Sequence, residues 1–108
     1  MFQQLFLLLS PIYKYQIFGS SMLPTLKPGD MVLVNRMSYL FLSPKINDIV
    51  AVKDPREGKV LIKRIMKIEG KSYFVQGDNK NASTDSRVFG MIGRINIIGK
   101  VTDVKFPI

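Results

Sequence analysis

Short apolar runs separated by turn residues are the feature of this sequence that most restricts its fold. From Ile17 onward the apolar residues stand in small groups with glycine, proline and asparagine-aspartate breaks between them, and no segment has the spacing of a long amphipathic helix. This pattern predicts an all-β domain in which about five to seven strands form a partly closed, barrel-like sheet. The predicted strands are rich in valine and isoleucine and span residues 31–35, 48–53, 60–68, 72–76 and 97–105.

The N-terminal part of the chain differs from the rest. A chain of 108 residues has room for one compact domain, and we divide it into an apolar arm, residues 1–16, and a folded domain, residues 17–108. The apolar run itself, residues 2–9, is too short for a helix that spans a membrane. A secretory signal peptide carries positive charge before its apolar run, whereas the first charge here is Lys14, which follows it. The arm therefore either packs on the domain or contacts a membrane interface.

The amino-acid composition excludes many catalytic mechanisms. The chain contains no histidine, cysteine or tryptophan. A Ser-His-Asp or Cys-His site cannot be built, and the usual ligands of zinc, haem and iron–sulfur clusters are missing, so we expect no metal and no cofactor. Sixteen lysines and arginines against eight acidic residues give a net charge of +8. Such a charge suits an anionic partner, either nucleic acid or a phospholipid surface.

Two adjacent serines are candidates for a nucleophile. Without histidine or cysteine, the remaining choices are serine or threonine assisted by lysine or a carboxylate, or lysine itself through a Schiff base. Ser20 and Ser21 follow Gly19 in an apolar stretch, and Pro24 stiffens the chain after them. The alternative interpretation is a loop whose serines only cap turns.

Lys63 is the candidate base. An ammonium group cannot accept a proton, so a basic lysine must be buried, where desolvation lowers its pKa. Strand alternation gives Lys63 the apolar neighbours Leu61 and Ile65 on its own face of the sheet. A Ser-Lys pair is therefore chemically attainable. The alternative is that Lys63 faces solvent at a sheet edge.

A polar stretch interrupts the strand pattern at residues 77–87. Glycine, asparagine, aspartate and serine dominate it, which on composition alone is typical of a surface loop or a cluster of turns.

Three segments, taken in order, resemble the type I signal peptidases and their relatives, the mitochondrial inner-membrane peptidases and the small maturation proteases of that family. Residues 21–26 resemble the nucleophile segment of the family, and Lys63-Arg64 resembles its lysine segment. The resemblance extends over about residues 17–102. The third segment is matched by Gly77, Asp78 and Asn79, followed by Ser83, Asp85, Ser86 and Arg87.

The resemblance implies a Ser-Lys catalytic dyad. Ser21 would attack a peptide carbonyl, and Lys63, neutral at rest, would take the serine proton and later pass it to the leaving amine. The oxyanion would be met by the backbone N–H of Ser21, helped in some branches of the family by a hydroxyl two residues earlier. This chain has Gly19 at that position, so the side-chain donor is absent.

The resemblance also implies residues that support the dyad. Ser83 matches a position whose hydroxyl orients the lysine, and Asp85 with Arg87 matches a pair that braces the loop beside the site. Gly77 would keep the approach to the lysine uncrowded.

The function that the resemblance implies is that of a serine endopeptidase with a signal peptidase-type fold. Its partner would be a precursor protein, from which it removes a signal peptide or propeptide after small residues. The enzyme would be membrane-associated with its active site on the extracytoplasmic side. The family's transmembrane anchor is missing or reduced to residues 2–9, which leaves a soluble or peripherally bound form open.

Two other functions remain as alternatives. A non-enzymatic basic β-barrel that binds single-stranded nucleic acid would explain the charge but not the three segments, so no nucleic-acid partner is expected. A self-cleaving Ser-Lys domain of the SOS-repressor type commonly cuts an Ala-Gly bond. Here Ala51 and Ala82 are followed by Val52 and Ser83, and no such bond exists.

Overall fold

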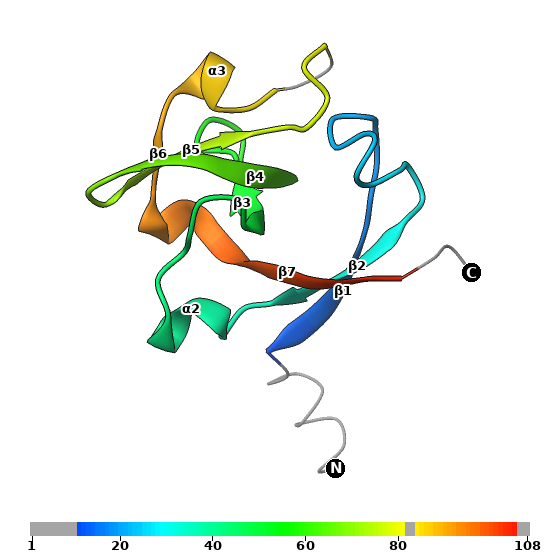
Figure 1. Cartoon of the computed structure of the whole chain (residues 1–108), viewed down its shortest axis with the longest axis horizontal. Helices are drawn as coiled ribbons and strands as arrows, with labels where there is room; N and C mark the ends of the chain where they lie inside the picture. The colour runs from blue at the N-terminus through cyan, green and yellow to red at the C-terminus, as the bar shows by residue number, and fades with distance from the viewer. Residues whose placement is uncertain (1–10, 82–83, 106–108) are drawn as a thin grey trace.

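A single curled antiparallel sheet runs through the computed structural model, which describes residues 11–81 and 84–105 (Figure 1). Its strand order is β1-β2-β7-β3-β4-β5-β6. Two short helices, α2 (Ser38–Phe41) and α3 (Ser86–Phe89), and a 3-10 turn (Arg94–Asn96) lie in the connections. The strands are β1 (Ile12–Gln16), β2 (Met31–Asn35), β3 (Ile49–Lys53), β4 (Val60–Glu69), β5 (Ser72–Gln76), β6 (Ile92–Gly93) and β7 (Ile97–Lys105).

The structure confirms the predicted all-β, partly closed architecture. All five predicted strands are present, and their bounds differ from the prediction by a single residue at the start of β3 and at the end of β4. The sequence pattern missed β1, which falls inside the stretch assigned to the arm and pairs with β2. It also missed β6, because a strand of two residues carries no periodicity. The proposed packing or membrane contact of residues 2–9 lies outside the described residues.

The curl of the sheet brings β1 close to the beginning of β4, although three strands separate them in the sheet order. The Tyr15 hydroxyl of β1 donates a hydrogen bond of 2.9 Å to the carbonyl oxygen of Val60. Apolar side chains fill the inside in two clusters, one around Val50 and Val75 and the other around Val32 and Ala51. The bend therefore places the loop after β1 beside β4.

The turn before β2 has the geometry that its residues predict. The Asp30 N–H donates to the Lys27 carbonyl at 3.0 Å, and Gly29 has a φ of +92°. Pro28 followed by a glycine with positive φ is the pattern of a type II turn. In the described part of the chain, no helix has the length and apolar character needed to cross a membrane.

Candidate active site

The loop that connects β1 to β2, residues 17–30, carries Ser21, and we call it the nucleophile loop. Met22 and Leu26 are each only 1% exposed and belong to the core cluster around Val32. The Leu26 N–H also donates to the Met22 carbonyl at 2.9 Å. Two buried side chains on either side of a tight turn thus fix the backbone beside Ser21, which is itself half-buried.

Lys63 lies in the middle of β4, opposite Val50 of β3, and is only 3% exposed. The predicted burial is confirmed, and the alternative of a solvent-facing lysine is wrong. Burial lowers the pKa of Lys63 below its ordinary value. The carboxylate of Asp85 raises that pKa and offsets part of the effect, while the charge of Arg87 lowers it further. The environment thus favours the neutral amine relative to a lysine in water.

The structure brings the two predicted dyad residues to the same place. Ser21 and Lys63 both line one small pocket, with a volume of about 50 Å³, between the nucleophile loop and β4. Most of the other lining residues are apolar in type, although polar atoms form the larger part of the pocket surface. Lys63 is poorly solvated because its side chain is buried. The other lining residues are Tyr15, Ile17, Phe18, Met22, Val60, Leu61 and Ile62.

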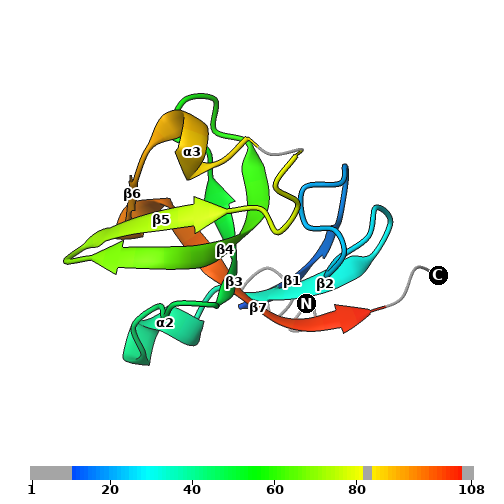
Figure 2. The same cartoon turned by 45° about the horizontal axis from the view of Figure 1, so that its top comes forward.

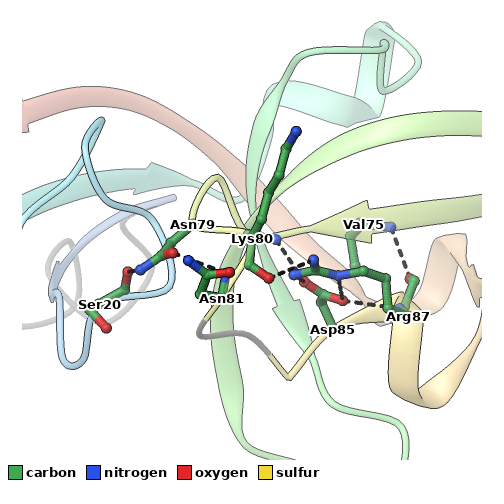
Figure 3. Close-up of polar contacts among 9 residues, drawn as sticks. Ser20, Val75, Asn79, Lys80, Asn81, Asp85 and Arg87 are labelled. Carbon is green, nitrogen blue, oxygen red and sulfur yellow. Dashed lines mark hydrogen bonds and ion pairs between the residues drawn. The ribbon is translucent and has the colours of Figure 1, made fainter.

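The predicted ion pair between Asp85 and Arg87 is present and joins residues within the polar segment (Figure 3). Asp85 is fully buried. Its carboxylate accepts hydrogen bonds of 2.8 Å from Arg87 Nη2 and from the Gly77 N–H. Arg87 Nη1 donates to the Lys80 carbonyl at 3.1 Å. The pair therefore holds both the start of the loop after β5 and its middle. Ser83 lies outside the described residues.

Part of the polar segment is buried, which corrects its interpretation as a surface loop. Gly77, Asp85 and Ser86 are buried. The Ser86 hydroxyl accepts a 2.9 Å hydrogen bond from the Val75 N–H of β5, and so attaches α3 to the sheet. Composition predicted the loop correctly but not its burial, because burial depends on hydrogen bonds between residues eight and eleven positions apart, Gly77 with Asp85 and Val75 with Ser86.

Asn79 connects the loop after β5 to the nucleophile loop. Its backbone N–H donates to the Ser21 carbonyl at 2.8 Å, and its side-chain amide donates to the Ser20 carbonyl at 3.0 Å. Figure 3 shows this amide pointing at Ser20, with its oxygen accepting from the Asn81 N–H at 3.1 Å. The backbone of the proposed nucleophile is thus held by a residue to which sequence reasoning gave no role.

Asp78 joins all three motif segments. Arg64 donates to its two carboxylate oxygens from Nε and Nη2, each at 2.9 Å, and the Thr25 hydroxyl donates at 2.5 Å. Arg64 also donates from Nη1 to the Asn47 carbonyl at 2.9 Å. The Arg64 hydrogen bonds hold the pKa of Asp78 below its ordinary value, against the opposing effect of partial burial. A carboxylate just after β5 and an arginine next to Lys63 were visible in the sequence, but their pairing was not.

Replacing Asp78 with asparagine should loosen this junction. Asparagine has nearly the same shape as aspartate but lacks the negative charge that pairs with Arg64 through two hydrogen bonds. We therefore expect a loss of about 1–2 kcal/mol in the free energy of unfolding. Chemical denaturation of the parent and variant measures it. The matched control is Glu57→Gln, which breaks the exposed pair with Lys59 and should cost well under 1 kcal/mol. Equal losses in both variants would contradict a structural role for the Asp78 junction.

Comparison with known proteins gives consistent similarities. The family model described as "Signal peptidase, peptidase S26" matches residues 2–72 and 66–105. The chain is 29% identical over 134 residues to "Probable signal peptidase I-1" of Synechocystis sp., covering 82% of this chain and 68% of that protein. It is 35% identical over 108 residues to "Mitochondrial ATP-independent inner membrane protease subunit 1a" of Arabidopsis thaliana, covering 78% and 64%. It is 29% identical over 142 residues to "Signal peptidase I V" of Bacillus subtilis, covering 84% of each chain.

Proposed function

Because the chain belongs to the signal peptidase family, peptidase S26, a family of serine-type peptidases, we propose that it cleaves precursor proteins with a Ser-Lys dyad. Ser21 is the proposed nucleophile and Lys63 the proposed base. The observation that carries the proposal is the small pocket that Ser21, which is half-buried, and Lys63, which is buried, line together. This residue pair also accounts for a hydrolase without histidine or cysteine.

The proposed mechanism moves one proton in two steps. Neutral Lys63 takes the proton of the Ser21 hydroxyl as the oxygen attacks the substrate carbonyl, and the lysine becomes an ammonium. The ammonium then protonates the leaving amine as the peptide bond breaks, which leaves an acyl-enzyme and a neutral lysine. Neutral Lys63 then takes a proton from a water molecule as its oxygen attacks the acyl carbonyl. The resulting ammonium gives the proton to the Ser21 oxygen as the ester bond breaks, which releases the acid and restores both residues. The backbone N–H of Ser21 is the proposed donor to the oxyanion.

Asp85 and Arg87 are proposed as positioning residues. Their ion pair braces the loop whose Asn79 holds the Ser21 carbonyl, and their opposite charges act on the pKa of Lys63 in opposite directions. The buried Gly77 donates its N–H to Asp85, and we keep it as the residue that leaves the approach to the lysine uncrowded. Ser83 remains the proposed orienting hydroxyl.

The pocket that Ser21 and Lys63 share is small, with a volume of about 50 Å³. A small space beside the proposed nucleophile suits a small substrate side chain better than a large one. We therefore propose that small residues precede the cleaved bond in a signal peptide or propeptide.

We also propose that the enzyme works in association with a membrane, with its active site on the extracytoplasmic side. The similarity to a protein named as an inner membrane protease subunit supports this assignment. The net charge of +8 is compatible with an anionic lipid surface. A soluble or peripherally bound maturation protease stays open within the proposal.

The proposal is tested by cleavage of precursor peptides with Ala-X-Ala sites and varied flanks. Ser21→Ala should lower kcat/KM by about 10⁶-fold, to the background rate, because the attacking oxygen is gone. Ser20→Ala is the matched control: it removes the neighbouring hydroxyl but keeps the carbonyl that Asn79 holds, so most of the activity should persist. Unchanged cleavage by Ser21→Ala would refute the assignment of the nucleophile. Steeply salt-dependent binding of oligonucleotides without any cleavage would instead support the nucleic-acid alternative.

A further inference from the structure

The short helix α2 (Ser38–Phe41) has one residue in the core and its apolar neighbours in solvent. Tyr39 is buried in the core cluster around Val50 and Val75, and its hydroxyl donates to Asp48 at 2.6 Å. By contrast, Leu40 is 61%, Phe41 is 89% and Leu42 is 65% exposed. The buried tyrosine thus anchors the helix in an orientation that exposes three consecutive large apolar side chains to solvent. Exposed apolar patches on soluble proteins often mark interaction sites.

Basic residues surround this apolar tip. One hollow beside α2 is lined by Lys71 and Arg94, and a second hollow on the helix is lined by Lys45 and Lys100. Asp48 is the one acidic residue that lines either hollow in the described part of the chain. Its carboxylate accepts the Tyr39 hydroxyl and lies 3.7 Å from the Lys100 ammonium. The residues around the tip therefore carry a net positive charge.

We propose that this surface docks the enzyme on the interface of an anionic phospholipid membrane. The docking surface consists of Leu40, Phe41 and Leu42 together with the rim formed by Lys45, Lys71, Arg94 and Lys100. The inference rests on the membrane association proposed above and names the part of the fold that makes the contact. Apolar side chains enter the boundary between headgroups and acyl chains, while the lysines extend their ammonium groups to the lipid phosphates. Arg94 adds positive charge from a fixed position, since its guanidinium donates to the Ile97 carbonyl and lies over the Tyr39 ring.

The shape and charge of the surface favour lipid over a protein partner. Figures 1 and 2 both show α2 at one end of the molecule, outside the curve of the sheet. A protruding tip enters a fluid interface without a preformed pocket, and flexible lysines adapt to mobile headgroups. A protein partner would need a matching acidic cavity. The charge complementarity is therefore met most simply by a membrane that contains anionic lipid.

The docking surface is separate from the proposed active site. In both views α2 lies at the opposite end of the molecule from the loop between β1 and β2 and from the loop that follows β5 (Figures 1 and 2). Neither of the two hollows beside α2 shares a lining residue with the pocket of Ser21 and Lys63. Changes in α2 should therefore leave the cleavage of a soluble peptide unchanged, so docking and catalysis can be measured independently.

The absence of tryptophan allows a site-specific probe of docking. The Phe41→Trp variant of the 108-residue chain should shift its tryptophan fluorescence to shorter wavelength when vesicles of phosphatidylcholine and phosphatidylglycerol are added. Lipids with bromine-labelled acyl chains should quench this fluorescence. The matched control is Val88→Trp, at a position 60% exposed on α3, which should show neither effect. Vesicle binding without any change in the Phe41→Trp emission would overturn the proposal, because another part of the chain would then make the contact.

Vesicle co-sedimentation gives the energetic test. Leu40→Ser combined with Phe41→Ser should weaken binding at least about tenfold, and Lys45→Ala combined with Lys71→Ala about thirtyfold at low salt. The controls Val88→Ser and Lys59→Ala should bind like the parent. Equal binding to pure phosphatidylcholine, or self-association of the parent in place of vesicle binding, would overturn the proposal. Soluble-peptide cleavage in the same samples reports separately on the proposed function.

Discussion

Replacing Lys63 with methionine is expected to abolish peptide cleavage while leaving the fold at least as stable near neutral pH. Methionine has a similar length and fits an apolar environment but cannot accept a proton, so kcat/KM should fall by at least about a hundredfold. Lys63 is buried and its pKa is lowered, mainly by desolvation. In the folded parent, the charged form of this lysine is therefore held at a cost that the variant does not have.

The stability gain should depend on pH with a definite sign. The folded-state pKa of Lys63 lies below that of the unfolded chain, about 10.4. Below the folded-state pKa both states of the parent are protonated and the full cost is present. As pH rises from that pKa toward 10.4 the unfolded state binds more protons than the folded state, so the parent gains stability. The advantage of Lys63→Met over the parent should therefore be largest at neutral pH and fade toward about pH 10.4.

Thermal unfolding across this pH range measures the effect, and Lys67→Met is the matched control. Lys67 lies on the same strand, is 62% exposed and pairs with Glu69, so its replacement should give no pH-dependent gain. The buried-base proposal would be refuted if Lys63→Met were less stable than the parent and if this loss of stability were greater at neutral pH than at high pH. Retained cleavage would refute it independently.

Replacing Asp85 with asparagine should change both the stability of the protein and the pH profile of cleavage. The fully buried carboxylate accepts hydrogen bonds from the Gly77 N–H and from the backbone and side chain of Arg87. Removing its charge leaves the guanidinium without its counter-ion, and we expect a loss of about 3 kcal/mol in the free energy of unfolding. Cleavage should fall about tenfold or more as the loop loses its brace.

The pH profile distinguishes an electrostatic role from a merely structural one. Asp85 raises the pKa of Lys63, so Asp85→Asn should lower that pKa further. The acid limb of kcat/KM, which reports the deprotonation of the base, should then move to lower pH. An acid limb that stays in place would contradict the coupling between Asp85 and Lys63 even if the fold is weakened.

A second pair of the same construction provides the control. Asp54 is also buried and accepts from the N–H and side chain of Arg56, two residues later, as Asp85 does from Arg87. The carboxylate that acts on the pKa of Lys63 is that of Asp85. Asp54→Asn should therefore also destabilise the protein but leave the acid limb of cleavage where it is in the parent. A shift in both variants would point to a general effect of loosening the fold.

The sequence by itself determined the β architecture, the turn before β2 and the identity of the proposed dyad. Valine- and isoleucine-rich runs between turn residues are local signals, and strand periodicity follows from them directly. The three motif segments and their order in the chain indicated the family. Ser21 and Lys63 could be singled out because each stands in a short motif of neighbouring residues. β1 was missed because its alternating half-buried and exposed residues follow an apolar run that obscures where a strand begins.

Only the tertiary structure decided which of these residues meet. Strand alternation predicted which face of the sheet Lys63 lies on but not whether that face is covered. Its burial depends on the curl of the sheet, which brings the nucleophile loop beside β4. The Thr25–Asp78 and Ser20–Asn79 contacts join residues 53 and 59 positions apart. The exposure of Phe41 likewise depends on the burial of Tyr39. Sequence patterns report short-range backbone preferences, whereas a shared pocket, a buried ion pair and an uncovered apolar tip result from packing between distant segments.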